Sequence, residues 1–154
     1  MLENYVQQDL LLLETQAETR EEIIDRLAEL MEQRACMQDT ESFLNRVYEK
    51  QKQGVSLVGD IAAVAYATSD TVPETRIAFA HLTNPIYWEG NANVSYVYLI
   101  AFSQDLRDEQ KDLIHRALSQ QLMDEAFIKA LYEVEEVDDW MALTTQQKKQ
   151  TSGV

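Results

Sequence analysis

The run Val94–Phe102 constrains the fold of this chain more than any other segment, because Ser95 is its only residue that is neither aliphatic nor aromatic. β-branched and aromatic side chains favour the extended backbone of a strand. A strand that is apolar on both faces lies inside a sheet whose two faces are both covered. The sequence therefore predicts a covered sheet with this segment as a central strand.

Segments with helical periodicity lie on both sides of the strand-forming region. Thr19 and Glu22 form the pattern of a capping box, which predicts that a helix begins there. Gly54 is expected to end a second helix. The segments expected to be helical are 19–34, 39–54, 108–123, 126–131 and 134–143.

Strands are expected where β-prone residues lie between turn residues. Gly59 and Asp60 mark a hairpin-like break, and Asn84 and Pro85 mark a turn. The expected strands are 9–13, 55–58, 61–66, 76–82 and 94–102. Helices, then strands, then helices predict an α/β (α+β) fold in which helices flank a mixed β-sheet.

Length and charge narrow the domain organisation and the partners. The chain has 154 residues, and we expect one domain at residues 1–143 followed by a disordered tail at residues 144–154. The formal net charge of −14 disfavours binding to nucleic acid and to an acidic membrane surface. The same charge would attract a basic protein partner, or it could serve only to keep the protein soluble. No segment is long enough to insert into a membrane, no secretory signal is visible, and the lone Cys36 fits a reducing cytosol, so a cytoplasmic protein is expected.

The segment Gly54–Tyr66 aligns without a gap with G-S-T-G-I-G-N-G-I-A-I-P-H. It thereby resembles the active-site loop of EIIA domains of the fructose/mannitol type, from the sugar phosphotransferase system (PTS). Leu82–Trp88 is similar to the family's L-K-E-P-I-x-W motif, and Val94–Phe102 is similar to its long strand. The resemblance covers residues 3–143 and implies the EIIA fold. The loop positions that follow the pattern are Gly54, Ser56, Val58, Gly59, Ala63 and Val64.

The departures from the pattern lie at the positions that carry the family's chemistry. The resemblance implies that Tyr66 stands where the family has its phosphorylated histidine, and that Gln110 stands where a second histidine assists the phosphate. Ala65 replaces the preceding proline and Leu57 replaces a glycine, whereas Ser56 keeps the hydroxyl equivalent to the family's threonine. These are the candidate site residues.

A tyrosine is a poor substitute for a phosphate-carrying histidine. Imidazole, with an ordinary pKa of about 6.5, has a free lone pair near neutral pH, whereas a phenol has an ordinary pKa of about 10. Phosphotyrosine is also a low-energy ester, which cannot pass its group on as phosphohistidine does. Tyr66 is therefore expected to be inactive. It either fills the emptied phosphate pocket or belongs to a partner-binding surface.

The other potentially reactive residues are expected to have structural or surface roles. His81 is expected to be a half-buried strand residue rather than a substitute acceptor. His115 follows Gln110 by about 500° of helical rotation, so it points about 140° away and is expected on the solvated surface. Cys36 is expected to be a small side chain near a helix end, and the acidic run 133–139 a solvated face. No metal or cofactor is expected.

Three functions compete. The first is a catalytically degenerate, non-enzymatic EIIA-like regulatory domain, from or beside a sugar-responsive transcription regulator that carries phosphotransferase regulation domains. Its partners are HPr, an EIIB-like module, the regulator's own domains or a second copy. The alternative is an active EIIA phosphocarrier that passes a phosphoryl group from HPr to EIIB for sugar uptake, using His81 or an unexpected acceptor. The third is an interaction scaffold with no link to sugar. The losses at Tyr66 and Gln110 favour the first.

Overall fold

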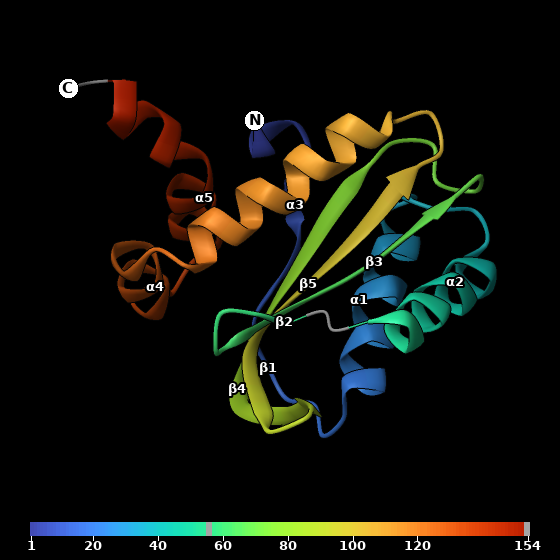
Figure 1. Cartoon of the computed structure of the whole chain (residues 1–154), viewed down its shortest axis with the longest axis horizontal. Coiled ribbons are helices and arrows are strands. Elements are labelled where there is room, and N and C mark those ends of the chain that lie inside the picture. Colours follow the sequence, from blue (N-terminus) through green and yellow to red (C-terminus); the bar gives the residue numbers. More distant parts are fainter. Residues whose placement is uncertain (55–56, 153–154) are drawn as a thin grey trace.

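The computed structural model describes the backbone of residues 1–54 and 57–152 and the side chains of residues 1–54 and 57–145. Its strands are β1 (Val6–Thr15), β2 (Leu57–Val58), β3 (Ala62–Ser69), β4 (Arg76–Glu89) and β5 (Ala92–Ser103). Within the described residues they form one sheet in the order β1-β4-β5-β3-β2 (Figure 1). β1 is parallel to β4 and β3 to β5, whereas β4–β5 and β2–β3 are antiparallel pairs. The sheet is therefore mixed, with β5 at its centre as predicted.

Helices cover both faces of this sheet (Figure 1). They are the 3-10 helix η1 (Leu2–Asn4) and the α-helices α1 (Arg20–Gln33), α2 (Thr40–Gln53), α3 (Asp108–Leu122), α4 (Glu125–Tyr132) and α5 (Val137–Ser152). α1 and α2 pack on one face, and α3, α4 and α5 pack on the other. This arrangement confirms the predicted mixed sheet flanked by helices. In the described part of the chain, no helix has the length and hydropathy needed to cross a membrane.

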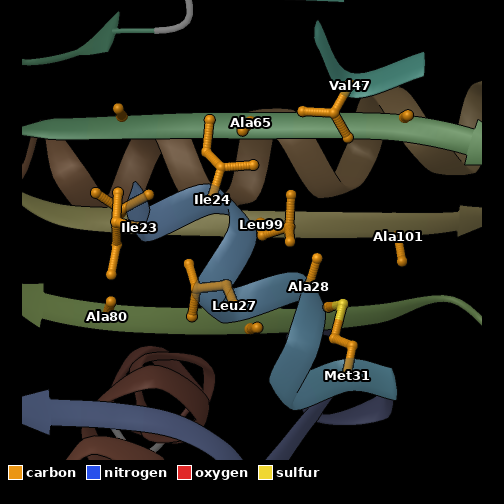
Figure 2. Close-up of a cluster of buried hydrophobic side chains, with 14 of the residues drawn as sticks. Ile23, Ile24, Leu27, Ala28, Met31, Val47, Ala65, Ala80, Leu99 and Ala101 are labelled. Carbon is orange, nitrogen blue, oxygen red and sulfur yellow. The ribbon is translucent and has the colours of Figure 1, made fainter. Parts of the chain in front are cut away.

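The sheet face under α1 and α2 carries six alanines among larger apolar side chains, and we call the cluster there the alanine-lined core. The alanines that the sheet contributes are Ala63, Ala65, Ala67, Ala78, Ala80 and Ala101. Ile23, Ile24, Leu27 and Met31 of α1 fill the space above them and are 0% exposed (Figure 2). Because the alanines are short, the branched side chains of α1 can pack directly over them.

The opposite face carries large rings, and we call the cluster there the aromatic core. Phe79 lies at its middle, with its ring centroid 5.0 Å from that of Tyr98 and 5.0 Å from that of Trp140 on α5. Tyr96 and Phe102 complete the set, and all five rings are at most 1% exposed. Because successive strand residues alternate between the two faces, the sheet builds one core that contains many alanines and one that contains large aromatic rings.

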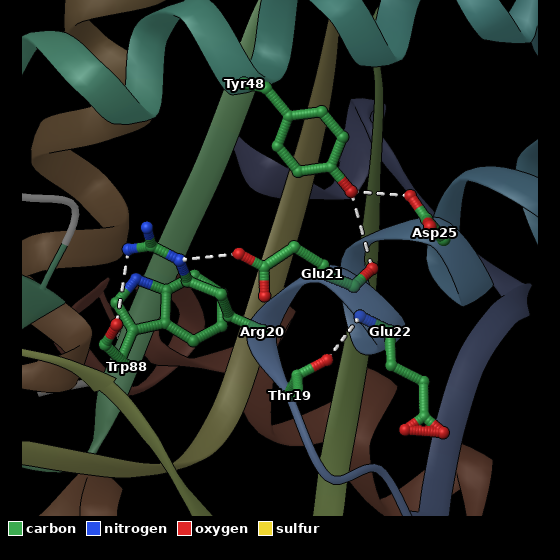
Figure 3. A network of polar contacts seen from close by, with 7 residues as sticks. All are labelled: Thr19, Arg20, Glu21, Glu22, Asp25, Tyr48 and Trp88. Carbon is green, nitrogen blue, oxygen red and sulfur yellow. Dashed lines mark hydrogen bonds and ion pairs between the residues drawn. The ribbon is translucent and has the colours of Figure 1, made fainter.

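The start of α1 is tied to α2 and β4 by polar contacts (Figure 3). Thr19 Oγ1 accepts a hydrogen bond from the Glu22 backbone N–H at 3.1 Å, which confirms the predicted N-cap. The Tyr48 hydroxyl of α2 donates to Asp25 Oδ1 at 2.5 Å. Arg20 Nη1 donates to the backbone carbonyl of Trp88 at 3.2 Å. These contacts fix the first helical layer against the end of β4.

The turn predicted at Asn84 and Pro85 is wrong, because β4 continues through both residues. The pairing of β4 with β5 shifts register between His81 and Ile86, which pair with Tyr96 and Val94. The extra β4 residues form a bulge, where a proline without a backbone N–H can be accommodated. Turn-forming residues therefore mark an irregularity inside one long strand.

The segment 144–152, which the sequence predicts to be a disordered tail, instead continues α5. Trp140 anchors this helix in the aromatic core and is 0% exposed. The Thr144 carbonyl accepts a hydrogen bond from Gln121 Nε2 at 2.9 Å, and Thr144 is 3% exposed. The domain limit at residue 143 stays a prediction, and residues 153–154 lie outside the described part.

Candidate functional site

Tyr66 lies in the second half of β3, where it pairs with Ile100 of the central strand. Its ring is half-buried on the sheet face that carries α3. The ring centroid lies 6.1 Å from that of Phe102, with an angle of 78° between the ring planes. It lies 4.5 Å from the centroid of the His115 imidazole, at 72°. Edge-to-face contacts of this kind are favourable for aromatic rings, so they hold the phenol ring in place.

His115 is therefore not the solvated surface residue that the sequence predicts. It is half-buried, and its imidazole packs against both Tyr66 and Phe102, the latter at 5.5 Å between centroids. The prediction was wrong because it took Gln110 as the residue that faces the site. The α3 face that packs on the sheet instead carries Ile114 and Leu118, with His115 at its border.

Gln110 has a structural task at the beginning of α3. Its side-chain Oε1 accepts a hydrogen bond from the Arg107 backbone N–H at 3.2 Å, and the Gln110 N–H donates to the Arg107 carbonyl at 3.0 Å. These bonds cap the helix. The ring contacts of Tyr66 in the described residues are made with Phe102 and His115. The structure thus brings Tyr66 together with His115 and places Gln110 in the cap.

Burial sets the protonation of the histidine at this site. It lowers the pKa of His115 from 6.5, and the nearby carboxylate of Asp112 opposes this only in part. The imidazole is therefore neutral at pH 7 and keeps a lone pair. Lys111, one turn earlier on α3, holds its ammonium 5.9 Å from the centre of the Phe102 ring and pairs with Asp108 at 3.5 Å. A cation and a neutral imidazole thus flank the aromatic rings.

A hollow of about 400 Å³ lies beside the end of β3, on the side of α2. Arg46 and Lys50 of α2 line it together with Thr68 of β3, which comes two residues after Tyr66. Neither cation forms an ion pair within the described residues. Glu49 also lines the hollow but pairs with Lys52 at 3.8 Å, so Arg46 and Lys50 are the charges among the described lining residues that are left to attract an anion. Neither cation is among the candidate site residues of the sequence analysis.

The remaining sequence candidates lie apart from Tyr66. His81 is half-buried in β4, as predicted, and stacks on Tyr96 with 4.7 Å between ring centroids. Cys36 is buried at 7% exposure, and burial raises the pKa of its thiol, so it stays protonated. The carboxylates of the 133–139 run are exposed. Ser56 lies outside the described residues. Among those that are described, no group of three or more His, Cys, Asp or Glu side chains could hold a metal ion.

Comparison with known proteins agrees with the fold and with the family resemblance seen in the sequence. A sequence model of the family described as "Phosphoenolpyruvate-dependent sugar phosphotransferase system, EIIA 2" matches residues 4–146. The chain belongs to this family. The resemblance found in the sequence is thereby confirmed, and this protein is a PTS EIIA-type domain.

A curated relative and two solved structures show how far the likeness extends. The 2-O-alpha-mannosyl-D-glycerate-specific EIIABC component of the PTS of Escherichia coli (strain K12) is 33% identical over 82 residues, which are 53% of this chain and 12% of that protein. Nitrogen regulatory protein IIA-Ntr from Neisseria meningitidis superposes with a TM-score of 0.83 at 13% identity, covering 94% of this chain and 99% of that one. Enzyme IIAMTL of E. coli, in its complex with phosphorylated enzyme IIBMTL, superposes with a TM-score of 0.74 at 20% identity, covering 88% and 94%. At these identities the structures show a shared fold.

Proposed function

We propose that this EIIA domain carries no phosphoryl group at residue 66 and acts by docking other proteins in sugar-responsive regulation. The observation that carries the proposal is the phenol ring of Tyr66, which packs edge-on against His115 at 4.5 Å between ring centroids, at the residue that the resemblance aligns with the family's phosphorylated histidine. A phenol held this way lacks the nitrogen that a phosphohistidine needs. The fold of the family is retained around these changed residues, which favours docking without transfer.

The partner in this proposal is an EIIB-like module or HPr, either separate or within a transcription regulator that also contains this domain. The structural relative IIAMTL is seen in a complex with phosphorylated IIBMTL, and it has the same fold as this chain. The cationic hollow with Arg46 and Lys50 lies next to the end of β3. It offers a docking point for the phosphoryl group of a phosphorylated partner, because that group is anionic. The proposal also keeps a second copy of this chain as a partner.

The proposal is tested by incubating the domain with phosphoenolpyruvate, enzyme I and HPr and measuring its intact mass. We expect no added phosphoryl group, while a Tyr66→His variant tests whether the missing imidazole alone accounts for the loss. Binding to a phosphorylated EIIB module is then measured by calorimetry, with Lys50→Gln expected to weaken it. Stable phosphorylation of the unchanged chain would refute the first part, and equal binding of Lys50→Gln would refute the second.

A second candidate function rests on the position of His115. Its neutral imidazole lies beside residue 66 and could replace the missing acceptor, which would keep the domain an active phosphocarrier. A ring nitrogen would form a bond to phosphorus as the N–P bond of phospho-HPr breaks. Acid-labile, alkali-stable phosphate that disappears in His115→Gln but persists in His81→Gln would establish this function in place of the first. The two variants are matched, since both histidines are half-buried and packed on rings.

A further inference from the structure

An apolar groove of about 620 Å³ lies before the beginning of β3, between the β2–β3 turn and the α3–α4 junction. Leu122, at its base, is buried. Met123 and Tyr132 on its walls are large apolar side chains that are 74% and 59% exposed. Ile61, which lines the groove, is five residues before Tyr66, or about 16 Å along a strand. The groove is therefore separate from the site around residue 66.

The walls of the groove are held in place by the fold. Gly59 adopts a φ of +63°, and a Cβ at this residue would lie 3.3 Å from the carbonyl oxygen of Leu122. The turn thus lies directly against the end of α3. On the other wall, the ring of Tyr132 packs edge-on against the buried Tyr96, with 6.0 Å between centroids. A groove held from both sides needs little rearrangement to bind a ligand.

The charge around the groove selects the kind of partner. Asp60 and Glu125 line it, and Lys129 is the cation beside them. Glu133, next to Tyr132, and Asp124, next to Met123, are exposed as well. This excess of carboxylates, on a chain with a net charge of −14, repels a second copy and attracts a basic segment.

We propose that the groove binds a basic amphipathic segment of a partner protein. Its apolar side chains enter between Met123 and Tyr132, and its Lys or Arg side chains face Asp60 and Glu125. A methionine adapts its shape to different apolar side chains, and a tyrosine supplies a rigid contact area, as both do at protein interfaces. An amphipathic helix lying in an apolar groove is a common form of such recognition. This surface adds a second contact to the docking proposed at the hollow lined by Arg46 and Lys50.

The probe is a synthetic helical peptide of leucine and lysine, with its leucines at positions i, i+3, i+4 and i+7. Methyl NMR spectra of the full chain are recorded during titration. We expect the largest shifts at the methyl groups of Met123, Ile61 and Ile128, and no comparable shifts from a leucine–glutamate peptide of the same pattern. Tyr132→Ser should weaken binding about tenfold. The matched control is Tyr87→Ser, because Tyr87 is also an exposed tyrosine, at 61% against 59%.

Charge is tested by a second pair of variants. Asp60→Asn with Glu125→Gln should weaken peptide binding more than Asp70→Asn with Glu109→Gln, which removes the same charge from exposed residues elsewhere. Thermal melting checks that each variant folds, and Met123→Ser provides a second groove variant. Shifts spread over the surface, equal effects of the matched variants, or self-association through the groove would overturn the proposal. Tyr66→Ala should leave peptide affinity unchanged, so this test can fail without affecting the phosphorylation test.

Discussion

Replacement of Gly59 by alanine measures how firmly the β2–β3 turn is held against α3. Gly59 and Gly90 adopt nearly the same left-handed backbone, with φ values of +63° and +61°. A Cβ at Gly90 meets nothing within 4 Å, whereas one at Gly59 lies 3.3 Å from the Leu122 carbonyl oxygen. The two variants therefore share the backbone strain and differ in one close contact.

The expected costs follow from these two contributions. An alanine in the left-handed region costs about 1–2 kcal/mol, and the reduced freedom of the unfolded chain returns about 0.4–1 kcal/mol. Gly90→Ala should therefore lower the free energy of unfolding by about 1 kcal/mol. Gly59→Ala must also displace the end of α3 by a few tenths of an ångström, which brings its cost to about 2 kcal/mol. Gly54→Ala should instead raise the free energy of unfolding by about 0.4–1 kcal/mol, because its φ of −179° is extended and its Cβ meets nothing within 4 Å.

The assay is urea unfolding followed by circular dichroism, with the slope m required to stay constant among the variants. In a domain of this size, Gly59→Ala should lower the melting temperature by about 4–8 °C and Gly90→Ala by about 2–4 °C. If the Gly59 and Gly90 variants unfold with equal free energy, the contact with Leu122 does not constrain the turn. The preformed groove that rests on this contact would then lose its support.

Two further predictions concern the cores and the buried histidines. Leu99 is 0% exposed in the central strand, and Leu99→Ala should lower the free energy of unfolding by about 3 kcal/mol in the same urea assay. A loss under 1 kcal/mol would show that the alanine-lined core can collapse around the gap. Burial lowers the pKa values of both His81 and His115 in the folded state, so the unfolded chain binds more protons as the pH falls. Each histidine therefore contributes fully to the stability of the fold above pH 6.5, and this contribution declines as the pH falls through its lowered pKa. Replacement of both histidines by glutamine should flatten the dependence of stability on pH between 7 and 5.5.

The central strand and the helical layers could be predicted because their signals are local. Val94–Phe102 is apolar at consecutive positions, which fits only a strand with both faces covered, and β5 is that strand. Asn84 and Pro85 carried an equally local signal, but a bulge uses the same residues as a turn. Which of the two forms depends on pairing with β5, and a single segment does not encode that pairing.

The contact between Tyr66 and His115 could not be predicted from either residue alone. The positions are 49 residues apart in the sequence, and they meet because α3 returns across the face of β3 and β5. The rotation of α3 is set by Ile114 and Leu118 against the sheet. The spacing of Lys111, Ile114, His115 and Leu118 contains this information, but the assumption that Gln110 faced the site obscured it.

The difference between the two cores bears on which substitutions the fold can accommodate. Under α1 six alanines of the sheet leave room for the branched side chains of the helix, so a larger side chain at an alanine position would compete with them for space. Tyr66 lies on the other face, among bulky rings whose volume can be redistributed among neighbours. A substitution at residue 66 therefore acts on the aromatic core and on α3, and it leaves the contacts between the sheet and α1 unchanged.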